Sequence, residues 1–220
     1  CSSDLQYVQD LVVVEQDALC IARDLLGVCE NLYDNRPGDD TTVVAIKLKE
    51  ATYLDLFTGP PNDRQSDEKM IEIIKHAKGK VVLCGGTTAN IVARELDESI
   101  MIDLEHYTPK VPPMGYMKGI DLVTEGLLTL NATKEHLEKY LIEKQKGLVP
   151  EKIMGLDGAS RLARLLIEDS TFVTCWVGQA INPAHQNPDF PENFNLKNAV
   201  MHEIVKLLKQ MNKEVEVYYL

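Results

Sequence analysis

Two glycines and two threonines follow a short apolar stretch near the middle of the chain, as Cys84, Gly85, Gly86, Thr87 and Thr88. Glycine adopts backbone angles that are closed to other residues and lets a ligand approach the main chain. A helix that begins after these glycines would point its free N–H groups and its positive dipole end at the turn, where phosphates and carboxylates bind. The pattern is neither a Walker loop nor a dinucleotide-binding fingerprint. It therefore predicts either an anion site or a tight turn capped by Thr87.

A second polar group spans residues 182–188, which include two prolines, and contains Asn182, His185 and Gln186. These side chains offer several hydrogen-bond donors and acceptors, and His185 can titrate near neutrality. The group follows a predicted strand, and loops at the carboxyl ends of parallel strands form the ligand crevice. We expect either ligand contacts here or a rigid loop whose amides bond to its own backbone.

Two pairs of carboxylates are further candidates. Asp121 and Glu125 are four residues apart in a predicted helix, so they are expected on one face, where they would hold a cation or ligand hydroxyls or simply be solvated. Asp39 and Asp40 precede a predicted strand, and their oxygens suit Mg²⁺ or Mn²⁺, although Asp-Asp also forms ordinary turns.

Cys84 is either a thiol activated by the helix start or a buried strand cysteine. No catalytic nucleophile is predicted.

Composition narrows the classes of partner. The net charge is −11, so we expect no nucleic-acid or anionic-membrane surface. The five cysteines are odd in number and form no C-x-x-C pair, which indicates a reducing compartment. No signal peptide or membrane-spanning apolar run is evident, so we expect a cytoplasmic protein. The chain opens at Cys1 without Met, and we interpret it as a fragment.

The elements that would position these residues alternate between helix and strand. The predicted helices span residues 66–76, 87–96, 119–130, 133–145, 158–167 and 195–211. The predicted strands span residues 81–84, 99–104, 171–177 and 215–219. This alternation predicts an α/β domain over about 55–220, with a largely parallel sheet flanked by helices. The helical and strand patterns are lost over 51–66, which we interpret as its boundary with residues 1–50.

Residues 1–50 are expected to form a helix over 15–33 and a strand over 41–48. The run from Gly38 to Val44 (GDDTTVV) resembles the closing motif of the metal-dependent PPM/PP2C protein phosphatases, whose first Asp holds a catalytic metal. The resemblance implies that Asp39 binds Mn²⁺ or Mg²⁺ and that residues 1–50 are a helix–strand remnant of a PP2C-like β-sandwich. The run from Cys1 to Leu5 is similar to the family's Ser-Asp-Gly metal motif without its Gly, which implies Asp4 as a second ligand.

The remaining chain resembles the C-terminal extension of bacterial phosphatases related to stage II sporulation protein E. The matching runs are residues 58–61, 84–89, 119–126 and 182–188. The resemblance implies that the full-length protein is a metal-dependent serine/threonine phosphatase acting on a regulatory phosphoprotein, with an α/β regulatory domain. This chain alone is expected to be inactive. The alternatives are a stand-alone module that binds a phosphate-like or nucleotide-like anion, and a domain that forms a homodimer.

Overall fold

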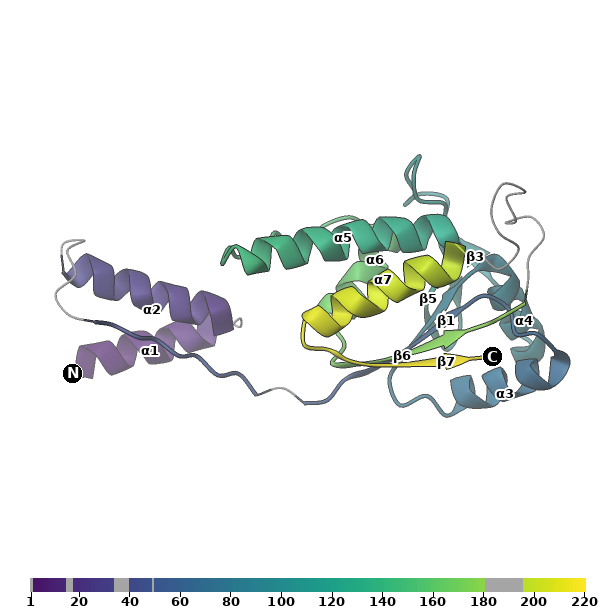
Figure 1. Cartoon of the computed structure of the whole chain (residues 1–220), viewed down its shortest axis with the longest axis horizontal. Coiled ribbons are helices and arrows are strands. Elements are labelled where there is room, and N and C mark those ends of the chain that lie inside the picture. The colour runs from purple at the N-terminus through teal and green to yellow at the C-terminus, as the bar shows by residue number, and fades with distance from the viewer. Residues whose placement is uncertain (1, 15–17, 34–39, 49, 181–195) are drawn as a thin grey trace. The chain divides into compact units, whose positions relative to one another are not determined.

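The structure is a computed structural model that describes residues 2–14, 18–33, 40–48, 50–180 and 196–220. The chain divides into two compact units, residues 1–50 and 51–220 (Figure 1). None of the helices in the described ranges is both long enough and apolar enough to cross a membrane.

The first unit contains two helices that contact each other, α1 (Ser2–Val14) and α2 (Ala18–Leu32). The second lies within the predicted helix over 15–33. The strand predicted over 41–48 is not formed, and the side chains of Val44, Ile46 and Leu48 are exposed. An alternating apolar segment becomes a strand only when a neighbouring strand pairs with its backbone. The described residues of this unit include no such partner.

The second unit is built on a seven-stranded sheet whose order is β3-β4-β5-β2-β1-β6-β7. Its strands are β1 (Tyr53–Thr58), β2 (Lys80–Cys84), β3 (Met101–Ile102), β4 (Gly115–Met117), β5 (Ile120–Thr124), β6 (Phe172–Val177) and β7 (Glu214–Tyr219). Five neighbouring strands, from β5 to β7, are parallel, and β3 and β4 join antiparallel at one side. The predicted α/β class with a largely parallel sheet is therefore confirmed.

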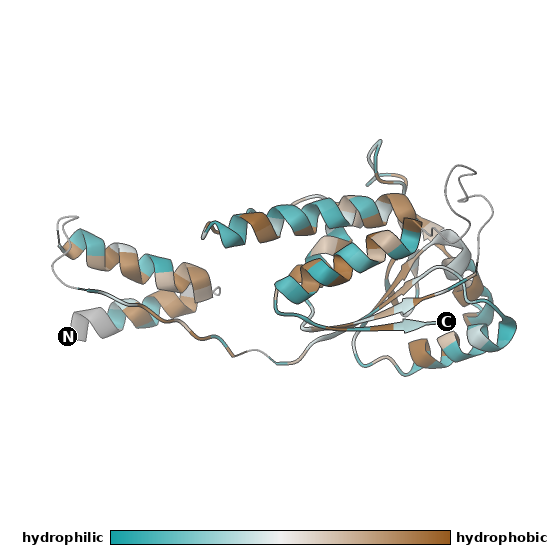
Figure 2. Ribbon diagram, viewed as in Figure 1, coloured by the Kyte–Doolittle hydropathy of each residue, from teal (hydrophilic) through white to brown (hydrophobic). Residues whose placement is uncertain are grey.

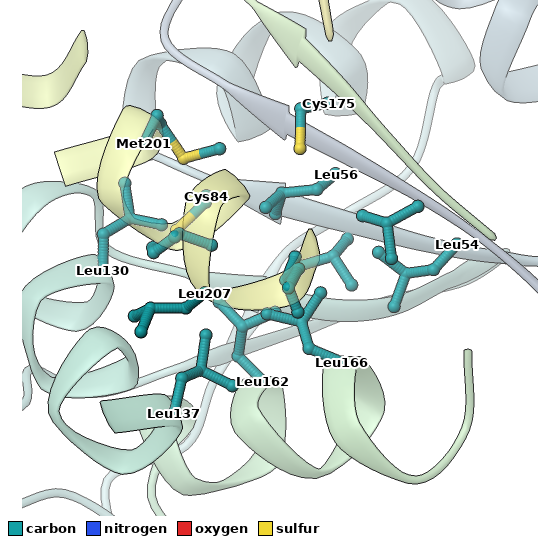
Figure 3. Packing of buried hydrophobic residues seen from close by; sticks show 14 of the residues in the cluster. Leu54, Leu56, Cys84, Leu130, Leu137, Leu162, Leu166, Cys175, Met201 and Leu207 are labelled. Atoms are coloured by element: carbon teal, nitrogen blue, oxygen red, sulfur yellow. The ribbon is translucent and has the colours of Figure 1, made fainter. Parts of the chain in front are cut away.

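Helices cover both faces of this sheet (Figure 1). They are α3 (Arg64–Lys75), α4 (Gly86–Leu96), α5 (Leu127–Gln145), α6 (Gly158–Ile167) and α7 (Leu196–Gln210). One face packs against α5, α6 and α7 through leucines such as Leu130, Leu162 and Leu207 (Figure 3), and the other packs against α3 and α4. Apolar residues are concentrated in the strands, while much of α5 is hydrophilic (Figure 2). This pattern places the core on the two faces of the sheet.

The central strand β1 falls in residues 51–66, where the loss of pattern predicted a domain boundary. Leu54, Leu56 and Phe57 are buried, but Asp55 interrupts the apolar run and hides the strand pattern. The Asp55 carboxylate accepts a hydrogen bond from Trp176 Nε1 on β6 at 2.8 Å. Burial raises the pKa of Asp55, and the indole hydrogen bond only partly offsets that rise. A partner 121 residues away therefore makes this strand possible.

The helix predicted over 119–130 is also wrong. Residues 120–124 form β5, a hairpin links this strand to β4 with Gly119 at φ +80°, and a single helix then runs from Leu127 to Gln145. Leu122 and Val123 are both buried because helices cover both faces of the strand, and the resulting apolar run hides the strand period. The break predicted between the helices over 119–130 and 133–145 lies inside α5. The strand predicted over 99–104 shortens to the two residues of β3.

Candidate functional site

The parallel strands all end at one edge of the sheet, which we call the carboxyl edge and define by residues 58–61, 84–88, 124–129 and 177–180. The helices that follow β5 and β6 lie on one face, and those that follow β2 and β1 lie on the other. Neighbouring strands therefore send the chain to opposite faces at two places, between β5 and β2 and between β1 and β6. Such switch points are where open α/β sheets bind ligands.

The side chains of the central strands change from apolar to polar at this edge. In the α5–α7 face, Leu56, Val82 and Leu122 form one row across three strands. Two residues further along each strand, the next row is Thr58, Cys84 and Thr124. A row of small polar side chains thus closes the apolar core where the strands end.

Glycines bring the backbones of three strands together. Gly85 has φ 136° and ψ 125°, angles that only glycine adopts without strain, and its N–H donates to Thr124 O at 2.9 Å. A Cβ added to Gly85 would lie 3.5 Å from Thr88 Oγ1 and 3.8 Å from Gly59 N. A Cβ added to Gly126 would lie 3.7 Å from Gly85 Cα. The starts of α4 and α5 are therefore immediate neighbours.

These two helices begin without a side-chain cap, unlike two others in the same unit. Asp63 accepts from the amide of Ser66 at the start of α3, and Asp157 accepts from two amides at the start of α6. The N-cap residues of α4 and α5 are Gly85 and Gly126, and neither helix has a capping side-chain hydrogen bond within the described residues. The first-turn amides and the positive dipole ends of both helices therefore remain available to an anion.

Several buried polar atoms around these helix starts have no hydrogen-bond partner in the described part of the chain. Thr58, Thr88 and Thr129 are at most 1% exposed, and the Oγ1 of each lacks a partner. The Oε2 of Glu125 is equally buried and also lacks a partner. An unpartnered buried polar group costs about 1–3 kcal/mol, so such atoms are uncommon in a finished interior.

Lys197 brings a positive charge to the neighbouring switch point. It lies in the first turn of α7, beside Gly59, and its Nζ donates to the carbonyl of Gly178. Burial lowers the pKa of its ammonium group. The side chain therefore connects the ends of β1 and β6 at the carboxyl edge.

The structure brings together part of the set of residues predicted from sequence. Gly86 and Thr87 are exposed at the start of α4, and Glu125 follows β5 beside Cys84. Cys84 itself is fully buried, with its Sγ 3.0 Å from Thr124 Oγ1 and 3.3 Å from Glu125 O. Burial raises the pKa of this thiol to about 12, and its contact with Thr124 only partly opposes that rise. Cys84 is thus a buried strand cysteine, as one of the two interpretations held.

Asp121 does not share the site with Glu125, because a strand of five residues separates the two edges of the sheet. It lies near the start of β5, where its Oδ2 accepts from Val81 N at 2.8 Å and its Oδ1 lies 3.5 Å from Lys80 Nζ. The pairing of the two carboxylates on one helix face was therefore wrong. Asp121 has a structural role at the amino edge.

The other predicted site residues cannot be placed together. Asn182, His185 and Gln186 lie outside the described residues, as does Asp39, while Asp4 lies in α1. The described residues contain no group of three His, Cys, Asp or Glu side chains that could hold a metal ion. The metal ligands therefore stay predictions.

A hollow that was not predicted from the sequence lies between α5, α6 and residues 151–155, with a volume of about 270 Å³. Its lining includes His136 and Ser160, whose Nε2 and Oγ are 3.4 Å apart. Ser160 Oγ donates to Asp157 Oδ2 at 2.8 Å. A serine nucleophile would give its proton to the histidine, which the acid would orient. Here the serine proton goes to the acid that caps α6, so these residues form a capping network.

An Asp before a helix is an ordinary sequence signal for a cap, but local sequence does not predict that His136 joins Asp157 and Ser160, because His136 and Ser160 are 24 residues apart on different helices. The orphan hydroxyl of Thr58 was missed for a related reason, since the strand that carries it was not recognised. The comparisons with known proteins add no assignment: the chain matches no protein-family model, no curated protein and no solved structure.

Proposed function

We propose that residues 51–220 form a binding module for a small anionic molecule held at the carboxyl edge between β2 and β5. One observation carries the proposal. Two adjacent helices begin without caps, at Gly85 and Gly126, and the buried hydroxyls of Thr88 and Thr129 in their first turns have no partner among the described residues. A phosphate or carboxylate placed there would satisfy both kinds of group.

Each part of the edge has a distinct role in this proposal. The exposed amides of Gly86 and Thr87 supply donors, and the two helix dipoles favour negative charge. Thr88 Oγ1 is a buried, unpartnered hydroxyl next to Gly85, 3.5 Å from the point where a Cβ on that glycine would lie. These local groups attract the anion although the whole chain carries a charge of −11. Close, oriented donors outweigh distant charges because salt screens exposed charges beyond about 8–10 Å.

The test is a thermal-shift and calorimetric titration of the chain with inorganic phosphate, ribose 5-phosphate and nucleotides. Ligand at about 100 times its Kd should raise the Tm of residues 51–220 by roughly 5–10 °C. Gly86→Val should abolish the shift, because a Cβ at Gly86 meets nothing within 4 Å and enters the open space above the amides. Gly27→Val is the matched control, since its Cβ also meets nothing within 4 Å but lies in the other unit. Failure of all these anions to bind would refute the module.

For the longer protein that the sequence resemblance implies, we propose a Mn²⁺- or Mg²⁺-dependent serine/threonine phosphatase in the cytoplasm, with residues 51–220 as its regulatory domain. Support comes from the residues 38–44 motif and from Cys84 and Cys175, which are buried thiols that form no disulfide with each other. The assay is metal-dependent release of phosphate from a phosphoserine peptide. The longer protein should turn over, its Asp39→Asn variant should lose at least about 100-fold in rate, and this chain alone should be inactive. Turnover by this chain alone would contradict the assignment.

A further inference from the structure

Glu125 places a negative charge beside the starts of two helices that favour anions. Its backbone is held firmly, because its carbonyl accepts from Thr124 Oγ1 at 2.9 Å and from Cys84 Sγ at 3.3 Å. Its Oε2 is shielded from solvent and has no hydrogen-bond partner in the described residues. No lysine or arginine of the described chain forms an ion pair with it. Oε2 is therefore a buried acceptor that lacks a donor within the described residues.

This acceptor restricts the ligand that the carboxyl edge can hold. An anion without donor groups would bring its own oxygens against the Glu125 carboxylate, and like charges at short range repel in a partly buried site. An anion that also carries a hydroxyl would place a donor on Oε2 while its charged end reaches the amides of Gly86 and Thr87. Buried acceptors discriminate strongly in favour of ligands that supply the missing donor.

We infer that the ligand is a hydroxyl-bearing phosphate, such as a sugar or polyol phosphate, and that Glu125 selects it by accepting a hydrogen bond from the ligand hydroxyl. This inference rests on the proposed anion site and adds its specificity. The phosphate lies at the helix starts after Gly85 and Gly126, and the hydroxyl is on the side of the site that Glu125 occupies. The orphan hydroxyl of Thr58 ends the neighbouring strand and offers a further contact.

The experiment compares two ligands that differ only in their hydroxyls, glycerol 3-phosphate and propyl phosphate, by calorimetry on the whole chain. The wild-type protein should bind glycerol 3-phosphate at least about tenfold more tightly. Glu125→Ala should reduce this preference to below about threefold while both esters still bind. Glu125→Gln should bind propyl phosphate more tightly than wild type by about threefold or more, because the like charge is gone. Glu135→Gln, at an exposed position of α5, should behave as wild type.

The outcomes distinguish a failure of the hydroxyl selection from a failure of the proposed anion site. Equal binding of the two esters by the wild type would overturn the hydroxyl selection and leave the anion site intact. A preference for glycerol 3-phosphate that survives in Glu125→Ala would have the same consequence. If neither ester nor inorganic phosphate binds wild type, the anion site itself fails. Should Glu125→Ala not fold, the wild-type comparison and the nearly isosteric Glu125→Gln variant still decide the question.

Discussion

At the amino edge of the sheet, where the strands begin, polar side chains find partners within the chain. Asp121 accepts a hydrogen bond from the amide of Val81 and lies beside Lys80. Lys213 Nζ donates to the carbonyls of Ile167 and Ser170, which precede β6. These contacts hold neighbouring strands together at their starts. The polar side-chain atoms that form them therefore already have partners within the chain.

At the carboxyl edge, the same sheet leaves comparable atoms without partners in the described chain. The hydroxyls of Thr58, Thr88 and Thr129 and one oxygen of Glu125 are buried and unpaired. The difference separates two uses of polar groups in one domain. Groups that the chain satisfies by itself contribute to stability, whereas groups that it leaves open contribute only when another molecule supplies the missing partner.

The largest expected contrast between the two edges comes from replacing one glycine at each edge with alanine. A Cβ on Gly79, at the amino edge, would overlap the carbonyl of Tyr53, and overpacking against backbone should lower the free energy of unfolding by about 3 kcal/mol. A Cβ on Gly86 meets open space, so Gly86→Ala should change the free energy of unfolding by less than about 0.5 kcal/mol. Urea denaturation of both variants measures the two free energies of unfolding. Similar losses in the two would mean that the carboxyl edge is filled.

A smaller effect is expected from removing a cap that the chain does supply. Asp157→Ala should lower the free energy of unfolding by about 1 kcal/mol, because the first amides of α6 lose their acceptor. Asp157→Asn should retain most of the stability, since asparagine caps helices about as well. Addition of inorganic phosphate should not rescue Asp157→Ala, in contrast to its stabilising effect at α4 and α5. Rescue would erase the distinction between capped and open helices.

The same cap predicts a pH dependence. Burial raises the pKa of Asp157, but hydrogen bonds from the Ser160 side chain and from the amides of Ser160 and Ala159 outweigh burial and bring it below its ordinary value of 3.8. A lowered pKa means that the stabilisation is complete above the unfolded pKa and is lost as the pH falls through the folded one. The wild type should therefore lose more stability than Asp157→Asn below about pH 4. Parallel pH profiles for the two proteins would contradict this.

Valine at two threonines contrasts an unpartnered hydroxyl with a partnered one. Thr58→Val replaces an orphan hydroxyl with a methyl group and should raise the free energy of unfolding by about 1 kcal/mol. Thr133→Val removes a hydroxyl that donates to Thr129 O at 2.8 Å, and this change should lower the free energy of unfolding by about 0.5–1 kcal/mol. Chemical denaturation without ligand is the measurement. Destabilisation by Thr58→Val would show that this hydroxyl already has a partner.

The smallest effect is expected at Cys84, a partnered side chain of the carboxyl edge. Its thiol is fully buried, and burial raises its pKa to about 12. Thiol reagents at pH 8 should therefore leave Cys84 unmodified in the folded protein and label it only after denaturation. The half-buried Cys20 and Cys29 serve as internal controls that should react first. Rapid labelling of Cys84 would mean that the edge opens far into the strand.

Part of this fold could be predicted from local pattern. The strand ending at Cys84, the helix following Gly86 and the α6 and β6 segments all lie where apolar periodicity and turn residues predicted them. The central strand β1 was missed because Asp55 breaks its apolar run, and only Trp176 explains how that carboxylate is tolerated. Strand β5 was mistaken for helix because both of its faces are buried.

The turn at Gly85 and Gly86 and the helix that follows are encoded locally, because the angles open to glycine are a property of that residue alone. That Thr58 and Gly126 adjoin this turn, and that Asp121 does not, follows from the arrangement of the whole sheet. Those neighbours depend on strand order and register, which pair Thr58 with Cys84 and Cys84 with Thr124 across long stretches of chain. Register is set by the burial of whole faces of the sheet, so a short motif does not specify it.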